Sequence, residues 1–560
     1  MKKLPEYEAL KQLYDKWLEA SSGWMKKDLE SIGELTFQQF QSELYERFSV
    51  EAEFGTGGLR SKIRAGINGI NDFWIKRICK ALRIHSKKIV IAYDTRRYSK
   101  KFAIEAANTL SAGQTQVFLF EEPVPTPLLS FAVKHLNCDT GIVITASHNP
   151  KEYNGFKLYD ENGVQYIPDK VNQLNKVIKK IPFFEKSELS PKPENIEKVG
   201  ETVYQAYFKQ VFEELKLLTP DNIQKRPQIQ VIYTPLHGTG ARFVPKIMTN
   251  YGIDVQVIQE QMDPDPDFST VEVPNPEVSE VFKMALKQAE HSELKPQALI
   301  ATDPDADRLG VFLENRGEYL SLTGNELGIL FTDFILRSLK VINYEEKSAI
   351  LKTIVTTDAV KPIAEAFNLL IFETLTGFKF LGNKSLELNE KGINTLFSFE
   401  ESYGYLYGNH AGDKDACSTA GLLALLLLDC GSGSGVFKRL DNIRAQYGFY
   451  LERLVSFTVE GLNGLKKLKE FMYTLRTDNP LKYWEDAIVL KDYLTEKGEL
   501  NADVVECHFL NGDRVIFRPS GTELKIKAYI NVHAANKNIA LKRLRWMEEK
   551  VKGLFDSNLK

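Results

Sequence analysis

The sequence predicts an α/β fold followed by a smaller α+β module. Between about residues 87 and 445, short β-branched runs alternate with helical stretches, which is typical of sheets covered by helices on both faces. After about residue 446 the pattern changes to a strand, a helix, hairpin-like strands and a terminal helix. At 560 residues the chain is too long for a single core, so we expect roughly three to five domains.

The helices are expected to begin at the N-terminus, within residues 1–50. The first would bury one face, formed by Tyr7, Leu10, Tyr14, Trp17 and Leu18. Thr36 and Gln39 are spaced as a capping box for a later helix. The expected strands of the alternating region are 89–91, 117–119, 142–144, 231–233, 255–258, 298–300 and 353–355.

The final module should contain a strand at 454–459, a helix at about 463–476 and a terminal helix to about residue 554. Its hairpin-like strands should lie near 503–518 and 525–532. Changes of pattern place the domain boundaries near 199, 322 and 445. The predicted domains are therefore 1–198, 199–322, 323–445 and 446–560.

Composition excludes several classes of protein. The net charge of −3 gives no bulk attraction to nucleic acid or to an anionic membrane. The five cysteines are scattered without a Cys-x-x-Cys pair, which fits a reducing compartment. No signal peptide is recognisable, and the apolar run Leu422–Leu428 is too short to span a bilayer. We expect that run to be a buried helix followed by a turn at 431–435, in a cytoplasmic protein.

The first candidate site is Ser147, which directly follows an apolar strand in the segment Gly141–Pro150. Ligands bind at this end of the strands in open α/β sheets. A serine hydroxyl needs a base or a pre-formed phosphoserine to act in catalysis. His148 is adjacent, but neighbouring side chains need not touch, so a Ser-His-Asp triad is not established, and a plain turn stays open. Lys157, ten residues on, could return to the same site.

The second candidate site is Asp303-Pro304-Asp305-Ala306-Asp307-Arg308, which follows a predicted strand. Three crowded carboxylates repel one another, and a hard cation such as Mg²⁺ would compensate them. Arg308 adds a fork for phosphate. An EF-hand, a phosphatase with an aspartate nucleophile and a solvated acidic turn are the alternatives; the EF-hand lacks glycine at its sixth position, where Arg308 stands.

Two further loops suit a phosphorylated sugar. Arg518–Glu523 combines arginine, two hydroxyls and glycine, the parts of an anion-binding nest, although an ordinary hairpin turn is the alternative. Thr376–Lys379 offers a second basic site. In Phe399–Gly404, paired acids and a serine could bind sugar hydroxyls, although glutamate pairs are usually solvated.

Taken together, these loops resemble the α-D-phosphohexomutase family and, within it, the phosphoglucomutase branch. The resemblance covers nearly the whole chain, and the joint order of the motifs is more specific than any one of them. The motifs are Phe54–Arg60, Tyr93–Arg96, Thr145–Pro150, Thr234–Gly240, Asp303–Arg308, Thr376–Lys379, Glu400–Ser402 and Arg518–Thr522.

The resemblance implies four domains around a central cleft, three related α/β units with mixed sheets and a C-terminal α+β domain. It implies a phosphoserine at Ser147, whose phosphate completes a Mg²⁺ site formed by Asp303, Asp305 and Asp307. The other implied residues are the general base Lys157, the arginines Arg60 and Arg308 near the transferring phosphoryl group, the phosphosugar contact Lys379, the sugar-hydroxyl contacts Glu400 and Ser402, and the phosphate anchor Arg518, Ser520, Gly521 and Thr522. His148 becomes a supporting neighbour of Ser147 in the catalytic group, with its role open.

The sequence departs from the family pattern at three positions. Ser61 stands where related sequences carry glycine or alanine, Arg64 where glycine is common, and Leu524 where proline often follows the glutamate. These changes alter loop backbone preferences. They bear on substrate preference and not on the chemistry.

The implied reaction is the reversible interconversion of glucose 1-phosphate and glucose 6-phosphate through a phosphoserine and glucose 1,6-bisphosphate. A phosphomannomutase, a phosphopentomutase or glucose-1,6-bisphosphate synthase, and a non-catalytic phosphosugar-binding protein are the alternatives. The implied partner is a phosphosugar, with no nucleic acid and no membrane. The sequence does not decide between a monomer and a dimer.

Overall fold

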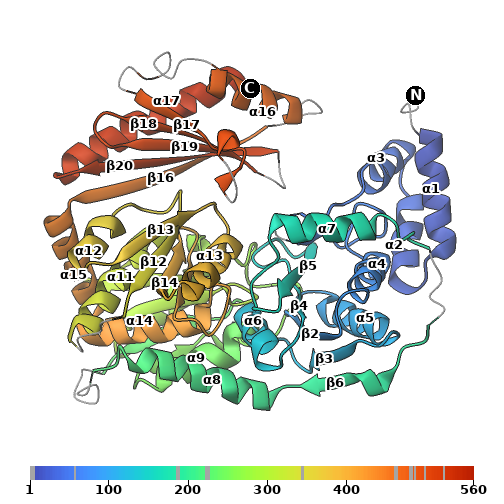
Figure 1. Cartoon of the computed structure of the whole chain (residues 1–560), viewed down its shortest axis with the longest axis horizontal. Helices are drawn as coiled ribbons and strands as arrows, with labels where there is room; N and C mark the ends of the chain where they lie inside the picture. The colour runs from blue at the N-terminus through green and yellow to red at the C-terminus, as the bar shows by residue number, and fades with distance from the viewer. Residues whose placement is uncertain are drawn as a thin grey trace. The chain divides into compact units, whose positions relative to one another are not determined.

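A computed structural model of the chain shows two compact units (Figure 1). The first comprises 1–216, 228–312 and 408–424, and the second comprises 217–227, 313–407 and 425–560. The residues that the structure describes are 7–55, 58–184, 189–220, 228–341, 346–459, 464–477, 484, 487–496, 500–520 and 524–559. This division differs from the four domains expected from sequence, whose boundaries stay a prediction.

Three helices at the start of the first unit form a core of their own. They are α1 (Tyr7–Ala20), α2 (Gly23–Gly33) and α3 (Phe37–Phe48), drawn side by side in dark blue in Figure 1. Trp17 of the predicted α1 face is fully buried and packs edge-on against Phe48 and Phe73. The capping box is confirmed, because Thr36 and Gln39 each accept a hydrogen bond from the other's backbone N–H.

The first sheet is mixed and has six strands in the order β1-β5-β4-β2-β3-β6. The strands are β1 (Leu59–Lys62), β2 (Lys88–Tyr93), β3 (Gln116–Phe120), β4 (Thr140–Ile144), β5 (Tyr153–Asp160) and β6 (Ile196–Val199). Strand β2 runs parallel to β3 and β4, whereas β5 runs antiparallel to both β1 and β4.

Helices cover both faces of this sheet, as the sequence predicts. The helices are α4 (Asp72–Leu82), α5 (Ser99–Ser111), α6 (Thr126–His135) and α7 (Pro168–Ile178). Ile142 and Ile144 of β4 share a core with α4, α5 and α7. Gly141 faces α6, because a Cβ there would lie 2.5 Å from the Val133 side chain. The two-residue period of a strand accounts for this alternation.

The second sheet has the order β11-β10-β9-β7-β8, with β7 parallel to β8 and β9. Its strands are β7 (Gln230–Thr234), β8 (Asp254–Val257), β9 (Ala298–Thr302), β10 (Leu309–Asn315) and β11 (Glu318–Leu322). The helices of this region are α8 (Glu201–Lys216), α9 (Phe243–Thr249) and α10 (Lys283–Glu290). Strand β9 is buried along its length and ends directly before Asp303.

The second unit begins its own sheet in the order β13-β12-β14-β15, with β15 antiparallel to β14 and the other neighbours parallel. The strands are β12 (Ser348–Thr353), β13 (Leu370–Thr374), β14 (Asn394–Glu400) and β15 (Gly404–Tyr407). The helices of this part of the chain are α11 (Gly324–Val341), α12 (Val360–Ala366), α13 (Phe378–Glu390), α14 (Ala416–Cys430) and α15 (Gly433–Tyr447).

The predicted strand 353–355 is wrong, because β12 ends at Thr353. Ile354 and Val355 are apolar for another reason. They are buried in a cluster with Tyr493, Ile516 and Tyr529 of the C-terminal module. The run is therefore apolar because it packs between two parts of the unit, although its pattern in the sequence resembles that of a strand.

The C-terminal module is α+β, as predicted. Its antiparallel sheet has the order β16-β20-β19-β18-β17. The strands are β16 (Phe449–Thr458), β17 (Ala487–Asp492), β18 (Val505–Phe509), β19 (Arg514–Pro519) and β20 (Lys525–Ala534). The helices α16 (Gly464–Thr477) and α17 (Lys537–Leu559) cover the sheet in Figure 1 and share its core.

The apolar run 422–428 lies in α14 and is buried, as expected. Among the described residues, no single helix has the length and apolarity needed to cross a bilayer, although α14 and α15, bent by 85°, meet that criterion as a pair. The break between them is a tight turn. Gly431 has a φ of 78°, and Ser432 Oγ accepts a hydrogen bond from Gly435 N at the start of α15.

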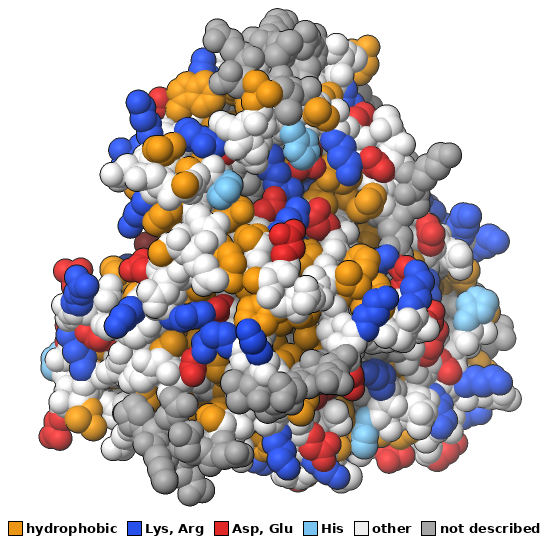
Figure 2. Space-filling model, turned by 60° about the vertical axis from the view of Figure 1, so that its left-hand side comes forward, with side chains coloured by type: hydrophobic (Ala, Val, Ile, Leu, Met, Phe, Trp, Pro, Cys, Tyr) orange, Lys and Arg blue, Asp and Glu red, His pale blue; other side chains and the backbone are white. Residues whose placement is uncertain are grey.

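The described part of the face in Figure 2 carries lysine and arginine side chains intermixed with acidic ones. This agrees with the small net charge of −3. Neighbouring charges of opposite sign largely cancel at a distance. Anion binding must therefore depend on local groups of charges.

Candidate active site

Ser147 follows β4 in a left-handed backbone conformation. Its φ of 53° costs a residue with a side chain about 1 kcal/mol, so other contacts must hold the turn. Thr145 Oγ1 accepts a hydrogen bond of 2.8 Å from Ser147 N. Ser147 Oγ in turn donates to Asp303 Oδ2 over 2.8 Å. The serine is only 1% exposed, and the two candidate loops therefore meet at this oxygen.

Arg96 holds the main chain of the same loop. Its buried guanidinium donates to the carbonyl oxygens of Ser147, Asn149 and Pro150. Burial lowers the pKa of Arg96, while the nearby carboxylate of Asp94 acts in the opposite direction. A charged guanidinium that binds three carbonyls of one turn stabilises the turn against its backbone strain.

The structure brings His148 into contact with the serine, which the sequence could not establish. His148 Nδ1 lies 3.1 Å from Ser147 Oγ. Burial lowers the pKa of His148 well below its usual range, and Arg308 and Arg60 lower it further. In a Ser-His-Asp triad the acid holds the histidine, whereas here Asp303 contacts the serine oxygen itself.

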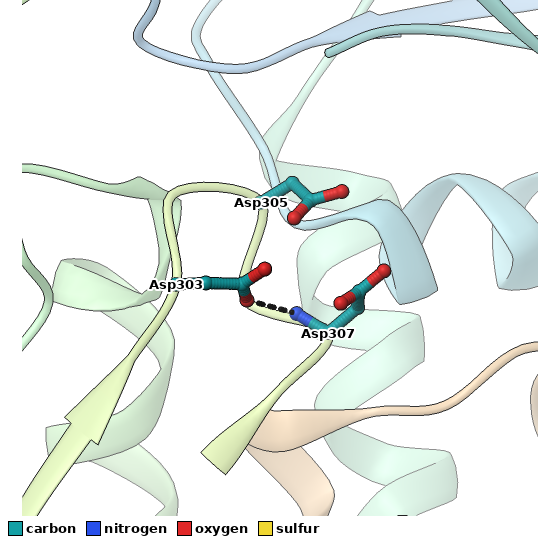
Figure 3. Close-up of side chains that lie close together, drawn as sticks. All are labelled: Asp303, Asp305 and Asp307. Atoms are coloured by element: carbon teal, nitrogen blue, oxygen red, sulfur yellow. Dashed lines mark hydrogen bonds between the residues drawn. The ribbon is translucent and has the colours of Figure 1, made fainter. Parts of the chain in front are cut away.

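The carboxylates of Asp303, Asp305 and Asp307 converge between β9 and β10 (Figure 3). One oxygen from each lies within 4.8 Å of the others, and all three residues are buried. Asp303 Oδ1 accepts hydrogen bonds from the backbone N–H groups of Asp307 and Arg308, at 3.1 and 3.0 Å. Burial excludes the solvated acidic turn, and the strand β10 directly after Arg308 excludes the helix that an EF-hand requires.

Two lysines compensate part of this negative charge. Lys157 Nζ lies 2.8 Å from Asp305 Oδ2 and 3.4 Å from Asp307 Oδ2. Lys414 Nζ lies 2.8 Å from Asp307 Oδ2. Burial would raise the pKa of Asp305, but Lys157 and the hydrogen bonds from its neighbours hold it well below the usual range. Burial raises the pKa of Asp303 well above its usual range, and Asp305 and Asp307 raise it further.

The carboxylate set fits a divalent cation. Asp305 Oδ1 and Asp307 Oδ1 are buried and have no hydrogen-bond partner among the described residues. Buried carboxylate oxygens without partners are costly, and a cation with oxygen ligands such as Mg²⁺ would satisfy them. The three aspartates could therefore bind a metal ion.

The motif Thr234–Gly240 contacts the carboxylate loop. Thr239 donates two hydrogen bonds to Pro304 O, from its N–H at 2.8 Å and from Oγ1 at 3.0 Å. Gly238 is required by this close approach, because a Cβ there would lie 2.5 Å from Pro304 Cα. This motif therefore supports the carboxylate loop from the neighbouring strand β7.

Arg60 and Arg308 both lie close enough to His148 to lower its pKa. Arg60 stands on β1 opposite Gly155 of β5, and its Nε is buried without a hydrogen-bond partner among the described residues. Arg308 forms an ion pair with Glu277. Alternation along β5 turns Lys157 away from its neighbours Phe156 and Leu158, which lie in the core. Both arginines and Lys157 therefore belong to the same cluster as Ser147, His148 and the three aspartates.

In the second unit, the structure brings Lys379, Glu400 and Arg518 together. Lys379 lies in the first turn of α13, and Gly377 N, just before it, donates to Glu400 Oε1 over 2.8 Å. Burial lowers the pKa of Lys379 to about 8, with Arg518 acting in the same direction and Glu400 in the opposite one. The group combines two cations and a carboxylate, which suits a phosphosugar.

Two other predicted residues of the second unit can be placed in the structure. Ser402 lies in the turn after β14, and its neighbour Glu401 accepts hydrogen bonds from Thr353 and Thr356. Ser520 N extends the β19–β20 ladder by donating to Lys525 O over 2.7 Å. Gly521 and Thr522 lie outside the described residues.

One departure from the family pattern has a structural account. Arg64 Nη1 donates to Glu46 Oε2 over 2.9 Å, and Arg64 Nε donates to Asn68 O over 2.9 Å. Glu46 belongs to α3, so this arginine attaches the N-terminal helices to the first sheet. Ser61 pairs with Asn154 across β1 and β5, and nothing in the structure explains Leu524.

Comparison with known proteins decides the family. Models of phosphoglucomutase/phosphomannomutase alpha/beta/alpha domains I, II and III match residues 51–185, 205–317 and 323–445. The phosphoglucomutase of Staphylococcus aureus strain MRSA252 is 32% identical over 535 residues, which cover 91% of this chain and 95% of that protein. The chain belongs to the α-D-phosphohexomutase family. It is a mutase of the phosphoglucomutase branch, and the family acts on phosphosugars.

Solved structures show that this phosphohexomutase shares the fold of its family. A putative phosphomannomutase from Thermus thermophilus has a TM-score of 0.67 at 23% identity, covering 90% of this chain and 99% of that one. The parafusin phosphoglucomutase from Paramecium also has a TM-score of 0.67, at 19% identity, covering 91% and 96%. The expected fold class, three α/β domains with mixed sheets and a C-terminal α+β domain, is confirmed.

Several supporting residues of this phosphohexomutase are not among those predicted from its sequence. The support by Arg96 and Thr239 was missed, although both stand in motifs that the family resemblance includes. The contact of Lys414 with Asp307 could not be foreseen, because the two residues lie far apart in the sequence. Thr126, whose Oγ1 donates to Asp305 Oδ2 over 2.9 Å, gave no signal, because it lies in the first turn of α6 beside Pro127, which reads as an ordinary helix start.

Proposed function

We propose that this phosphohexomutase interconverts glucose 1-phosphate and glucose 6-phosphate, with Ser147 carrying the transferred phosphoryl group and glucose 1,6-bisphosphate as the intermediate. The contact of 2.8 Å between Ser147 Oγ and Asp303 Oδ2, inside a buried carboxylate cluster, carries the proposal. The choice of glucose is supported by the name of the curated relatives, phosphoglucomutase.

We assign Asp303, Asp305 and Asp307 to a Mg²⁺ site that the serine phosphate completes. When bound, the cation would neutralise charge on the phosphoserine and on the phosphoryl group during transfer. The protein's own part is to hold the three carboxylates in place, through the N–H groups that bind Asp303 and the support of Pro304 by Thr239.

In the transfer step, the sugar hydroxyl oxygen forms a bond to phosphorus while the bond from phosphorus to Ser147 Oγ breaks. The hydroxyl proton passes to a base, for which we propose Lys157. Lys157 Nζ donates to Asp305 and Asp307 in the structure, and only a neutral amine can accept the hydroxyl proton. Arg60 and Arg308 supply positive charge for the phosphoryl oxygens. The proton lost by the sugar hydroxyl is balanced by one that Ser147 Oγ takes up as it leaves beside His148.

The intermediate then returns its other phosphate to Ser147. We propose that Lys379, Arg518 and Ser520, with Gly521 and Thr522, bind the phosphate that is not being transferred. Glu400 and Ser402 would bind the sugar hydroxyls. Because the sugar presents two orientations, the anchor must recognise phosphate charge and not the ring. Its binding energy holds the reacting hydroxyl in line.

A substrate comparison tests the proposal. We expect the purified chain, with Mg²⁺ and a trace of glucose 1,6-bisphosphate, to convert glucose 1-phosphate with a kcat/KM at least about tenfold above those for mannose 1-phosphate and ribose 1-phosphate. Equal or higher values for mannose or ribose would favour a phosphomannomutase or a phosphopentomutase. No turnover together with no phosphate on Ser147 would favour a phosphosugar-binding protein.

The lowered pKa of Lys379 predicts a pH dependence of substrate binding. Because only the ammonium form attracts a phosphate dianion, we expect kcat/KM to fall about tenfold between about pH 7 and about pH 9. The substrate phosphate is already a dianion in this range. Lys379→Arg should remove this fall, because arginine stays charged.

Lys384→Arg is the matched control, since Lys384 lies on the same helix and pairs with Glu387. It should keep the wild-type pH profile. The assignment to Lys379 is wrong if Lys379→Arg retains the same alkaline fall.

A further inference from the structure

A buried histidine fixes the segment Gly408–Asp415, which leads into α14. His410 Nδ1 lies 2.6 Å from Glu214 Oε2 of α8, and His410 Nε2 lies 2.8 Å from Asp415 Oδ2. The histidine side chain is 1% exposed. Asn409 N also donates to Glu214, at 3.2 Å. One imidazole ring therefore joins two carboxylates that lie far apart in the sequence.

This geometry requires a charged imidazole. A carboxylate can only accept hydrogen bonds, and a neutral imidazole has a single N–H, so one ring nitrogen would face an acceptor without a proton. Burial lowers the pKa of His410, but Glu214 and Asp415 raise it to about 10 overall.

The other titratable groups around His410 and its two carboxylates are Lys134 of α6, Tyr207 of α8, whose ring packs against the imidazole, and Cys417 of α14. Lys134 lies close enough to Glu214 to interact with its charge. Tyr207 donates to Asp415 Oδ2 over 2.6 Å and keeps its proton, because burial raises its pKa well above the usual range. Burial likewise raises the pKa of Cys417, which stays neutral. The two carboxylates therefore face two cationic partners, the buried His410 and the exposed Lys134.

The histidine orders the chain that touches the carboxylate cluster. Asp415 Oδ1 accepts hydrogen bonds from Cys417 N and Ser418 N, at 2.8 and 3.1 Å, and so caps α14. Directly before and after Asp415, Lys414 Nζ lies 2.8 Å from Asp307 Oδ2 and Ala416 N donates to Ala306 O over 3.2 Å. Whatever fixes Asp415 thus fixes both contacts to the loop of Asp303, Asp305 and Asp307.

Further tethers hold the rest of the segment. Gly412 N donates to Ser130 Oγ over 2.7 Å, and Tyr159 OH donates to Asp413 Oδ2 over 2.7 Å. These bonds would hold the peptide backbone even if His410 were replaced. His410, however, supplies the positive charge that the buried Asp415 requires. Without it, Asp415 would be a buried anion that keeps only neutral donors.

We propose that His410 is a positioning residue for phosphoryl transfer, an imidazolium that clamps Glu214 to Asp415 and thereby holds Lys414 against Asp307. This inference rests on the mutase function proposed above. Lys414 brings a second ammonium to a carboxylate that Lys157 also contacts. A positive charge that is already in place where negative charge moves during phosphoryl transfer needs no reorganisation in the transition state.

A double-mutant cycle tests this coupling. His410→Gln should lower kcat for glucose 1-phosphate about 100-fold, with KM changed less than about threefold, because misplacing Lys414 affects transfer and not binding. In a Lys414→Gln background the same change should lower kcat less than about threefold, since the group that it positions is already absent. Equal losses in both backgrounds would overturn the proposal.

His291→Gln is the control, because His291 is exposed and its Nδ1 hydrogen-bonds to Lys287 O one helical turn before it. It should leave kcat unchanged. If His410→Gln does not fold, Glu214→Gln replaces it in the same cycle, since the amide keeps an oxygen acceptor but removes the charge. The same pattern is expected, with the same outcome counting against the clamp.

A readout without turnover separates this inference from the proposed function. In the ¹⁵N-labelled full chain, both ring nitrogens of His410 should carry protons at about pH 8. A crystal structure of His410→Gln should show Lys414 withdrawn from Asp307. A neutral imidazole at about pH 7, or Lys414 still at Asp307 in the variant, contradicts the clamp. Absence of mutase activity in the wild-type chain contradicts only the proposed function.

Discussion

Ser147→Ala is expected to abolish mutase turnover, lowering kcat by at least about four orders of magnitude. The hydroxyl is the atom that carries the phosphoryl group, and no neighbour can replace it. The oxygen contacts a carboxylate that lies in the proposed cation site and a neutral histidine. A coupled assay with glucose 1-phosphate, Mg²⁺ and trace glucose 1,6-bisphosphate measures the loss.

The substitution should leave the fold intact, because alanine is no more strained than serine at a φ of 53° and Arg96 binds the main chain of the loop. Ser190→Ala, at an exposed serine of the same unit, is the matched control and should be fully active. Intact mass should show one phosphoryl group on the wild type and none on Ser147→Ala. Near wild-type conversion by Ser147→Ala would exclude the phosphoserine mechanism.

The elements that carry the site could be predicted because their signal is local. Strands β4 and β9 each contain a short apolar run, Gly141–Ile144 and Ala298–Ala301, so Ser147 and Asp303 could be placed after strand ends from the sequence alone. The carboxylates at alternate positions indicated a cation site for the same reason. Their burial and their unpartnered oxygens agree with that prediction.

The supporting residues could not be predicted because their contacts are made across long sequence separations. Arg96 reaches carbonyls more than fifty residues away, and His410 meets Glu214 across 196 positions. From the sequence alone, a long polar side chain is expected to be solvated. Only the packing of the surrounding elements reveals its partner. At Ile354 and Val355 the prediction was wrong for a different reason. These residues are apolar because they pack against the C-terminal module, and their apolar run was taken for part of a strand.

Asp305→Asn is expected to weaken divalent-cation binding by at least about 100-fold and to lower kcat by about three orders of magnitude at a fixed Mg²⁺ concentration. The amide keeps the size of the side chain and one oxygen, but it removes the negative charge. That charge is strongly favoured in the wild type, because Lys157 at 2.8 Å and Thr126 at 2.9 Å both bind it. Titration of Mn²⁺ followed by electron paramagnetic resonance measures the affinity, and raising Mg²⁺ should restore part of the activity.

Removal of the cation provides the complementary experiment. Wild-type chain treated with a chelator should lose turnover and regain it when Mg²⁺ is added, whereas Asp305→Asn should need a far higher concentration for the same recovery. Asp169→Asn, at an exposed aspartate in the first turn of α7, is the matched control and should follow the wild-type titration. If Asp305→Asn shows the wild-type dependence on Mg²⁺, the buried carboxylates do not form the cation site. The ion pairs with Lys157 and Lys414 would then be sufficient to explain their burial.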